Sequence, residues 1–339
     1  MSEPLICKIS LTKLINNALK VKSFINKRVK LCAVVKSDAY GHGLVDISSA
    51  LYSICDYFAV SLASEASKLR IAGIDKPILL LSPATENTIE KLILNDITLS
   101  VSTIKELILI AKTAKRLSKK VKVHIAINCG MNRLGFNDNE VVKAVNFIKK
   151  FSFIVLDGAY SHFGYVEDKR FTKSCFNNFL QAVKPIKEYN KRAILHISSS
   201  GGLLINKKYQ LSMVRVGLLL YGYSPIKTDK IKVEPIMKVY AKNLLSRNNV
   251  KGGYVGYGKY KCKIDNVSIL RLGYADGFMR NNANRFENNL CMDLSAVNFN
   301  KNDYVLVMDN ALEYSEKLKT IPYEILVSVT KRAEKEYFY

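Results

Sequence analysis

The chain has 339 residues, of which 48% are hydrophobic and 24% are charged, and its mean hydropathy is +0.02. This composition is typical of globular proteins and excludes wholesale disorder and collagen-like or low-complexity architectures. At about 150 residues per domain, the length predicts roughly two domains. No apolar run approaches the ~20 residues that cross a bilayer. The N-terminal sequence also lacks the pattern of a secretory signal, so we expect a cytoplasmic protein that makes no membrane contact.

Positive charge is the strongest bias in the composition. Lys and Arg total 52 against 29 Asp and Glu, a formal net charge of +23. Such a charge is typical of nucleic-acid-binding proteins. The lysines, however, are scattered singly and in pairs, and the sequence has neither zinc-finger spacing nor an aromatic RNA-binding motif. We therefore predict no specific nucleic-acid partner and only non-specific binding to polyanions at low salt.

The cysteines and histidines show no ligand spacing. There are seven Cys and four His, with no Cys-x-x-Cys pair and no His-Glu-x-x-His or His-x-His pair. An odd number of unpaired cysteines argues against a disulfide framework and against a zinc site. We predict free thiols in a reducing cytoplasm and no metal.

Short β-rich runs alternate with amphipathic stretches through the first two-thirds of the chain. The predicted strands are residues 31–35, 57–61, 77–81, 97–101, 121–127, 154–159, 193–197 and 213–221. Helical periodicity falls between them, for example over 44–54, 63–72, 103–118, 140–150 and 172–187. Eight such repeats predict a (β/α)8 TIM-type barrel. A doubly wound open sheet fits the same alternation, but no Gly-x-Gly-x-x-Gly motif follows the first strand.

The pattern changes after residue 225. Residues 226–232 are polar and basic, and short β-branched or aromatic runs follow at 239–245, 253–257, 267–274, 304–308 and 323–330. We predict a barrel domain over 13–225 and a mostly β C-terminal domain over 226–339. Residues 1–12 are expected to be extended and to pack with the β domain.

Lys36 directly follows the apolar strand 31–35. Barrel active sites lie at the C-terminal ends of the strands, which makes this lysine a candidate. A lysine at a strand edge can simply extend its amine into water. Alternatively, apolar surroundings lower the pKa of the amine and favour a Schiff-base nucleophile. Position alone does not decide between these interpretations.

The residues around Lys36 carry a family resemblance. Residues 33–43, AVVKSDAYGHG, closely resemble the pyridoxal-phosphate attachment motif of alanine racemases, which are fold-type III enzymes. In that family the lysine forms the Schiff base and the tyrosine four residues later contacts the cofactor phosphate. The resemblance implies that Lys36 holds pyridoxal 5'-phosphate and that Tyr40 binds its phosphate. It covers most of the chain, including 58–66, FAVSLASEA, which is similar to the second strand and its helix.

Other barrel segments are similar to the family's site. NCGMNRLG at 128–135 resembles a segment whose arginine contacts the cofactor ring and the substrate carboxylate, and a guanidinium fork suits a carboxylate. YSHF at 160–163, HISSS at 196–200 and MVRVGLLLYG at 213–222 resemble further cofactor-binding segments. Taken singly, each histidine fits an ordinary core position better than a cofactor contact. The resemblance implies that seven residues of these segments contact the cofactor: Arg133, His162, His196, Ser200, Arg215, Gly217 and Leu218. Gly217 and Leu218 would do so through their backbone amides, which hold the phosphate.

The β domain supplies the remaining candidates. GYVGYG at 253–258 resembles the segment that carries the family's second acid–base residue, which implies that role for Tyr257. CMD at 291–293 resembles the segment whose methionine backbone meets the substrate carboxylate, which points to Met292. The alignment of the chain's end places Tyr337 where the family has a phosphate-contacting tyrosine. Without the resemblance, these residues fit a turn tyrosine, a core methionine and a terminal aromatic.

Several positions depart from the family pattern. Ala126 stands where the family has a lysine that is commonly carbamylated and braces the arginine, and Asn128 stands where it has an aspartate. Ser199 replaces an asparagine, and a Glu-Lys pair replaces Pro-Arg before Tyr337. The brace of Arg133 is therefore absent or replaced, for instance by an anion bound near Asn128.

The resemblance implies interconversion of L-alanine and D-alanine by two bases. Lys36 would serve the D isomer and Tyr257, tuned through His162 and Arg215, the L isomer. It further implies a head-to-tail homodimer with shared active sites and D-alanine supply for peptidoglycan. Two alternatives stay open: a non-catalytic pyridoxal-phosphate-binding protein, against which the β domain argues, and a polyanion-binding protein on a decayed racemase scaffold. Serine or lysine racemisation and a barrel-type decarboxylase are further enzymatic alternatives.

Overall fold

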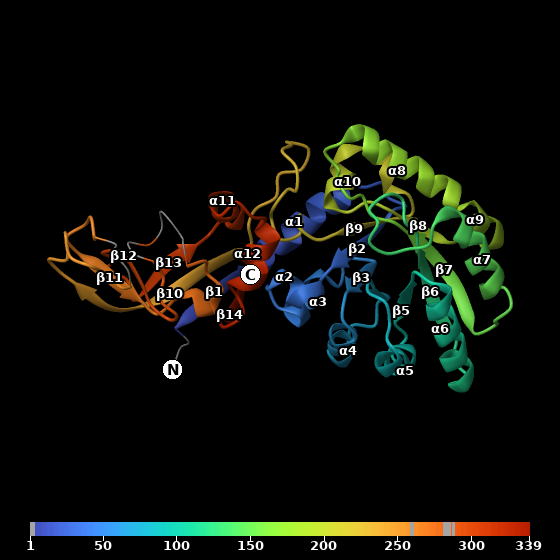
Figure 1. Ribbon diagram of the computed structural model, residues 1–339, viewed down its shortest axis with the longest axis horizontal. Coiled ribbons are helices and arrows are strands. Elements are labelled where there is room, and N and C mark those ends of the chain that lie inside the picture. Colours follow the sequence, from blue (N-terminus) through green and yellow to red (C-terminus); the bar gives the residue numbers. More distant parts are fainter. Residues whose placement is uncertain (1–3, 258–260, 281–285, 287–288) are drawn as a thin grey trace. The chain divides into compact units, whose positions relative to one another are not determined.

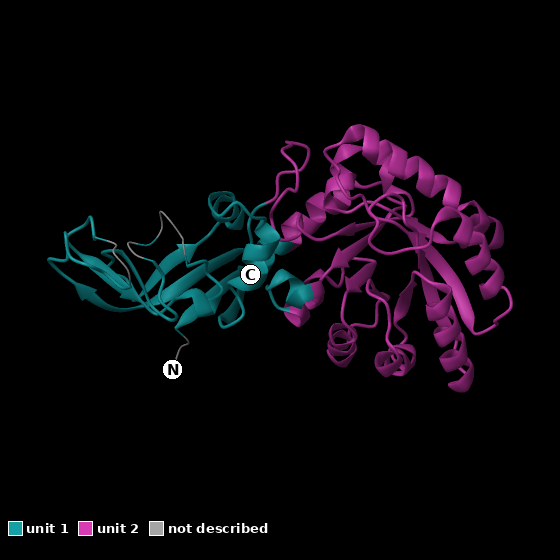
Figure 2. Cartoon of the chain, in the orientation of Figure 1, with its two compact units in different colours: residues 1–14, 37–43, 234–339 teal, residues 15–36, 44–233 magenta. Residues whose placement is uncertain are grey.

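The computed structural model describes residues 4–257, 261–280, 286 and 289–339 (Figure 1). The chain divides into two compact units, shown in Figure 2. Residues 15–36 and 44–233 form one, here called the barrel unit, and residues 1–14, 37–43 and 234–339 form the other, here called the β unit. The short segment that follows Lys36 thus belongs with the C-terminal part of the chain.

Eight parallel strands form the core of the barrel unit, in the order β8-β7-β6-β5-β4-β3-β2-β9. The sheet curls until its ends meet, because the amide of Ser212 donates to the carbonyl of Leu195 (3.0 Å) and the amide of Arg215 to that of Ser198 (3.0 Å). The predicted barrel is confirmed and the open-sheet alternative is wrong. The strands are β2 (Lys30–Val34), β3 (Tyr57–Val60), β4 (Ile78–Leu80), β5 (Thr98–Val101), β6 (Val121–Ala126), β7 (Ile154–Tyr160), β8 (Ile194–His196) and β9 (Met213–Val216).

Helices cover the outside of these strands (Figure 1). The clearest amphipathic helix is α6 (Ile104–Arg116), which begins at Thr103, whose side chain accepts from the amide of Glu106. Its residues Leu107, Ile110 and Ala114 are buried, as the helical spacing predicts. The other helices of this part of the chain are α1 (Leu11–Phe24), α3 (Leu44–Leu51), α4 (Ala63–Ile71), α5 (Glu86–Leu94), α7 (Asp138–Ile148), α8 (Lys169–Ala182), α9 (Lys184–Tyr189), α10 (Ser200–Ile205) and η1 (Lys207–Gln210). The short α2 (Lys36–Tyr40) lies, except for Lys36, in the segment 37–43 of the β unit.

A second sheet organises the β unit. Its order is β12-β11-β10-β1-β14, and β13 also pairs with β10. The N-terminal strand β1 runs antiparallel to β10 and parallel to β14, so both ends of the chain belong to this sheet. The elements are β1 (Leu5–Ser10), β10 (Met237–Arg247), β11 (Val267–Leu270), η2 (Tyr274–Asp276), β12 (Ser295–Asn298), β13 (Tyr304–Met308), α11 (Ala311–Lys317), α12 (Pro322–Ser328) and β14 (Glu334–Phe338).

Several predicted strands need correction. Residues 323–330 do not form a strand: α12 occupies most of this run, with Pro322 in its first turn. A short buried apolar run fits a helix as well as a strand, and the proline is a helix-start signal. Residues 253–257 form only an isolated bridge at Tyr254. The strands predicted at 213–221 and 267–274 end earlier, at Val216 and Leu270.

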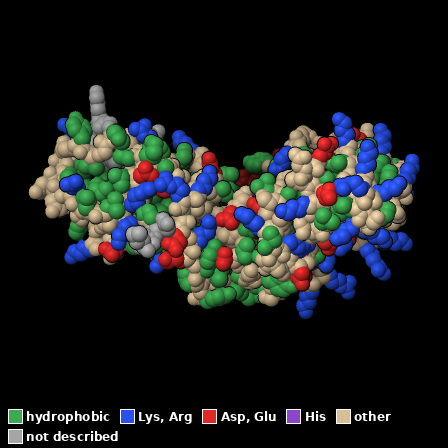
Figure 3. Space-filling model, turned by 90° about the horizontal axis from the view of Figure 1, so that it is seen from below, with side chains coloured by type: hydrophobic (Ala, Val, Ile, Leu, Met, Phe, Trp, Pro, Cys, Tyr) green, Lys and Arg blue, Asp and Glu red, His purple; other side chains and the backbone are tan. Residues whose placement is uncertain are grey.

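Surface charge follows the scattered pattern of the sequence. On the face shown in Figure 3, Lys and Arg side chains are spread over both units among apolar and acidic side chains. Within the described residues, no helix combines the length and apolar character that a membrane span requires.

We expect Leu107→Ala to lower the free energy of unfolding by about 2–5 kcal/mol, because it removes a fully buried side chain from the face of α6 that packs on the strands. Ile108→Ala on the same helix is the matched control, since Ile108 is 38% exposed, and its expected cost is about 0.5 kcal/mol. Urea denaturation followed by circular dichroism measures both. Equal costs would contradict the assigned face of the helix.

Candidate active site

The first candidate, Lys36, lies just beyond the C-terminal end of β2 and is half-buried. Burial lowers the pKa of its amine, the charge of Arg133 lowers it further, and Glu65 acts in the opposite direction. A lower pKa increases the fraction of neutral amine at physiological pH, which is the nucleophilic form. Partial burial and the lowered pKa are what a reactive lysine requires, and they differ from a lysine that extends freely into water.

The turn that follows Lys36 has an unusual backbone. Residues 37–40 all have φ between 53° and 55°, which forms one turn of left-handed helix without any glycine. It is closed by bonds from the amide of Gly41 to the carbonyl of Ser37 (2.9 Å) and from Gly43 to Asp38 (2.9 Å). Left-handed helix costs L-residues about 1–2 kcal/mol each. Strain of this kind concentrates at functional sites.

Tyr40 is the last left-handed residue of this turn, and Tyr337 contacts the segment that follows it. The Tyr40 ring lies 5.6 Å from that of Tyr323, and the Tyr337 hydroxyl donates to the carbonyl of His42 (3.1 Å). A Cβ at Gly43 would come within 1.8 Å of the Tyr337 hydroxyl, so only glycine permits this approach. The C-terminal strand thus brings Tyr337 to the segment that carries Tyr40.

Arg215 is the most enclosed charge of the barrel unit, at 4% exposed. Its guanidinium lies 2.5 Å from Nδ1 of His196 and 3.3 Å from Nδ1 of His162, and it donates to the carbonyl of Ser161 (2.7 Å). Burial, and then the Arg215 charge, lower the pKa of His162 to about 3 and that of His196 well below its ordinary value. Both imidazoles are therefore neutral, and each offers Arg215 a lone pair.

A small polar cradle lies beside these residues. The Ser200 hydroxyl oxygen accepts from the amides of Gly217 (3.3 Å) and Leu219 (3.5 Å), with Leu218 between them. A hydroxyl and successive backbone amides are donors that suit phosphate oxygens. The cradle is therefore a candidate phosphate site.

Arg133 is exposed in a loop that Asn128 organises. The Asn128 side-chain oxygen accepts from the amides of Gly130 (3.2 Å) and Asn132 (3.0 Å). Among the residues that the structure describes, the Arg133 guanidinium has no ion-pair partner, and it influences the pKa of both Lys36 and His162. It is thus placed to attract an anion near the amine of Lys36.

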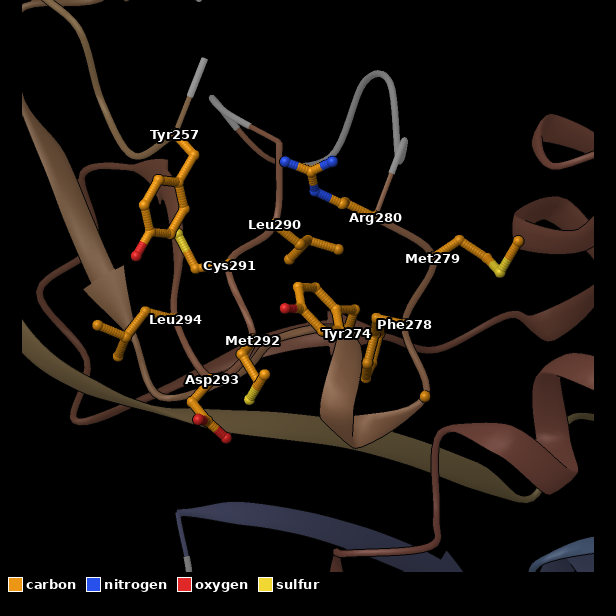
Figure 4. A pocket seen from close by; sticks show the side chains of 11 residues that line it. Tyr257, Tyr274, Phe278, Met279, Arg280, Leu290, Cys291, Met292, Asp293 and Leu294 are labelled. Atoms are coloured by element: carbon orange, nitrogen blue, oxygen red, sulfur yellow. The ribbon is translucent and has the colours of Figure 1, made fainter.

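Tyr257 and Met292 lie together in the β unit. They line a cleft of about 970 Å³, and Figure 4 shows the Tyr257 ring on the side of Leu294, with Tyr274 and Phe278 across from it. Tyr257 is 69% exposed. The Met292 carbonyl accepts from the amide of Ala275 (3.0 Å), which ties the Met292 segment to η2.

Comparison with known proteins decides the family. The family model of the alanine racemase N-terminal domain matches residues 9–225, and that of the C-terminal domain matches residues 236–337. The chain belongs to the alanine racemase family. An alanine racemase of Methanococcus maripaludis is 32% identical over 375 aligned positions that cover all of both chains. One of Clostridium tetani is 29% identical and covers 98% of this chain and 95% of its own.

Solved structures of alanine racemases share the whole fold. That of Clostridium difficile 630 has a TM-score of 0.93 at 30% identity, covering 99% of this chain and 96% of its own. That of Bacillus anthracis, solved with bound L-Ala-P, has a TM-score of 0.90 at 25% identity, covering 100% and 96%. The resemblance stated from the sequence motifs is therefore confirmed at the level of family and fold.

The structure divides the twelve predicted site residues between the units. Eight lie in the barrel unit: Lys36, Arg133, His162, His196, Ser200, Arg215, Gly217 and Leu218. Four lie in the β unit: Tyr40, Tyr257, Met292 and Tyr337. Sequence reasoning missed the buried His124 and the partly exposed Asp157, which extend the Arg215 hydrogen bonds. It also missed the ion pairs around the Met292 segment, which join Arg271 and Arg332 to Asp276 and Asp293.

We expect Gly273→Ala to destabilise the Met292 segment by about 1–3 kcal/mol, because the new Cβ would lie 2.1 Å from the Met292 carbonyl oxygen. A backbone carbonyl cannot relieve this clash by changing rotamer, as a side chain can. Hydrogen–deuterium exchange over 271–280 and thermal unfolding measure the effect. Gly253→Ala is the control: its nearest contact is 3.2 Å, and we expect a change of no more than about 1 kcal/mol.

Proposed function

We propose that this chain is a pyridoxal-phosphate-dependent alanine racemase that interconverts L-alanine and D-alanine with Lys36 and Tyr257 as its two bases. The observation that carries the proposal is the half-buried Lys36 amine. Its pKa is lowered, and it ends a barrel strand in a chain that matches the family over both domains. The family membership supports the substrate class, and the amine supports the chemistry.

The donor set of the barrel unit fits pyridoxal phosphate. The cofactor offers an aldehyde, a pyridine nitrogen and a phosphate. The Lys36 amine suits the aldehyde, the Arg215 guanidinium suits the ring nitrogen, and the Ser200 cradle suits the phosphate. The family resemblance adds Gly217, Leu218, Tyr40 and Tyr337 as further phosphate contacts of the proposed site. When bound, the cofactor withdraws electrons from the amino acid and makes its α-proton acidic enough to remove.

Arg215 limits which reactions the site supports. Burial lowers the pKa of its guanidinium to about 10, which still leaves the group charged and donor-only at physiological pH. Arg215 would therefore hold the ring nitrogen by a hydrogen bond without transferring a proton to it. Electron withdrawal by the ring stays moderate, which favours return of the proton to the α-carbon over transamination.

Two bases on opposite faces are needed to invert the α-carbon. Lys36 would exchange the α-proton of D-alanine and the Tyr257 hydroxyl that of L-alanine. Arg133 has an exposed guanidinium whose charge lowers the pKa of Lys36. It would bind the substrate carboxylate together with the backbone of Met292. His162 and His196, both neutral, would keep Arg215 in place beside the cofactor.

The oligomer and the role in the cell follow from the same proposal. We infer a head-to-tail homodimer in which Tyr257 and Met292 complete the site of the second copy. D-alanine is the product required for peptidoglycan. All seven cysteines are free thiols, which supports a reducing cytoplasm as the place of the reaction.

Lys36→Ala is expected to abolish the visible absorbance of bound cofactor, together with racemisation. Tyr257→Phe should keep the absorbance and lower turnover by about 10²–10⁴, the range for loss of a positioned acid–base group. The measurements are an absorption spectrum and the conversion of each alanine isomer. With α-deuterated substrates, Tyr257→Phe should raise the isotope effect more for L-alanine than for D-alanine.

The alternatives give different results in the same experiment. Cofactor absorbance without turnover in the wild-type protein would favour a non-catalytic cofactor-binding protein or a decayed scaffold. Absence of absorbance even after adding pyridoxal phosphate would contradict the role of Lys36. Faster turnover of serine or lysine than of alanine would contradict alanine as the substrate, and the proposed roles of the two bases would stand.

Mixing the two inactive variants tests the shared sites. In a head-to-tail dimer of Lys36→Ala with Tyr257→Phe, one site has lost both bases and the other is intact. Random mixing makes about half of all dimers mixed, so activity should return to about a quarter of the wild-type value. Dissociation and reassociation of the purified variants, followed by assay, provides the measurement. No recovery in a mixture shown to contain mixed dimers would place both bases on one copy.

A further inference from the structure

A chain of buried polar side chains runs through the barrel unit from Arg215. Nδ1 of His196 lies 2.5 Å from the guanidinium, Nε2 of His196 lies 2.8 Å from Nδ1 of His124, and Nε2 of His124 lies 3.5 Å from a carboxylate oxygen of Asp157. Both histidines are fully buried. Asp157 also accepts a hydrogen bond from the hydroxyl of Tyr57 (3.1 Å).

Arg215 at one end of this chain and the Asp157 carboxylate at the other each restrict the direction of the bonds, and the two restrictions agree. A guanidinium has no acceptor, so Nδ1 of His196 must accept from Arg215. A neutral His196 then carries its proton on Nε2 and donates it to Nδ1 of His124. His124 in turn carries its proton on Nε2 and donates to Asp157, whose carboxylate can only accept.

Burial supports neutral imidazoles throughout. It lowers the pKa of both His124 and His196; for His124 the hydrogen bond and charge of Asp157 act in the opposite direction without cancelling the effect of burial, and the Arg215 charge lowers the pKa of both. The hydrogen bond from His124 lowers the pKa of Asp157, which keeps that carboxylate ionised. The chain therefore joins the buried cation Arg215 to the partly exposed anion Asp157 through two neutral imidazoles. Each imidazole accepts on Nδ1 and donates from Nε2.

The backbone shows that the position of Asp157 is specific. The β6–β7 register shifts between Val123 and His124, so that Leu156 pairs with Val123 and Gly158 with His124. Asp157 is the extra residue of this bulge, and bulges redirect side chains. A Cβ on Gly158 would lie 2.8 Å from the His124 ring, so the glycine makes room for that ring. Bulge and glycine together aim Asp157 at His124.

We propose that Asp157 and His124 are positioning residues of the racemase: the carboxylate selects the Nε2-protonated tautomer of both histidines and thereby presents a lone pair to Arg215. Neither residue is placed in contact with substrate or cofactor. With the carboxylate removed, His124 is free to protonate on Nδ1. His196 would then have to carry its proton on Nδ1, facing the donors of Arg215. The consequence for activity rests on the proposed function, whereas the tautomers do not.

The direct test is the protonation of the imidazole nitrogens in the full-length protein with pyridoxal phosphate, by ¹⁵N NMR of labelled histidine. The chain has only four histidines, so single variants assign the signals. We expect His124 and His196 to be protonated on Nε2 and bare on Nδ1. A proton on Nδ1 of either ring overturns the proposal, whether or not the protein racemises alanine.

Asp157→Ala tests the role of the carboxylate. We expect a second tautomer of His124 and His196, about tenfold weaker cofactor binding and about tenfold lower kcat with little change in KM, the scale at which losing an outer partner acts. Asp157→Glu should recover a large part of each loss. The control Asp56→Ala removes another partly exposed carboxylate of the barrel unit, which pairs with Lys22 (2.6 Å), and should leave the histidine signals unchanged.

Each outcome separates the two proposals. Unchanged tautomers and cofactor affinity in a folded Asp157→Ala protein overturn the role of Asp157 while racemase activity stands. Equal losses of cofactor affinity and kcat in Asp56→Ala would show that the effect of Asp157→Ala is general destabilisation. That result would also overturn the positioning role of Asp157. If Asp157→Ala does not fold, Asp157→Asn provides the same test at nearly constant volume, because an amide can donate as well as accept and no longer selects one tautomer of His124; unchanged tautomers in that variant overturn the role of the carboxylate.

Discussion

The buried guanidinium of Arg215 is the constraint on which the barrel site depends. A charge this deep is tolerated only when its donors are satisfied. The acceptors are the carbonyls of Ser161, His196 and Ile197 and the Nδ1 atoms of two imidazoles. These groups come from the ends of β7 and β8, while Arg215 lies on β9, so the charge is satisfied only where the barrel closes. Fold and site are therefore set by the same contacts.

The second constraint is the strained turn after Lys36. Four consecutive left-handed residues cost several times the roughly 1–2 kcal/mol of one such residue, and the β unit offers compensating contacts. Asp38 pairs with Lys335 (3.1 Å), and the carbonyl of His42 accepts from Tyr337. A Cβ at Gly41 would lie 2.4 Å from the carbonyl of Leu326, which shows how closely α12 packs on the turn. Contacts from residues 326–337 thus hold the backbone that directly follows Lys36.

The sequence predicts the repeated elements well and the buried polar detail poorly. All eight barrel strands are predicted because each is an apolar run flanked by helical periodicity. Residues 323–330 mislead, since a short apolar run has no period of its own and Pro322 alone marks the helix. His124 has the pattern of an ordinary core residue of a strand, and the sequence marks the bulge at Asp157 only weakly. Gly158 is the one signal: a glycine inside a predicted strand indicates a bulge or a close approach.

The departures at Ala126 and Asn128 form a consistent local design. The Asn128 amide donates to the side-chain oxygens of Asn132 (3.0 Å) and Asn137 (3.4 Å). An aspartate at this position would have no proton to donate and would face two oxygens. The loop that carries Arg133 is therefore held by neutral amides, where family members commonly use a carbamylated lysine and an aspartate. Among the described residues the Arg133 charge has no ion-pair partner, which suits the carboxylate-binding role proposed for it.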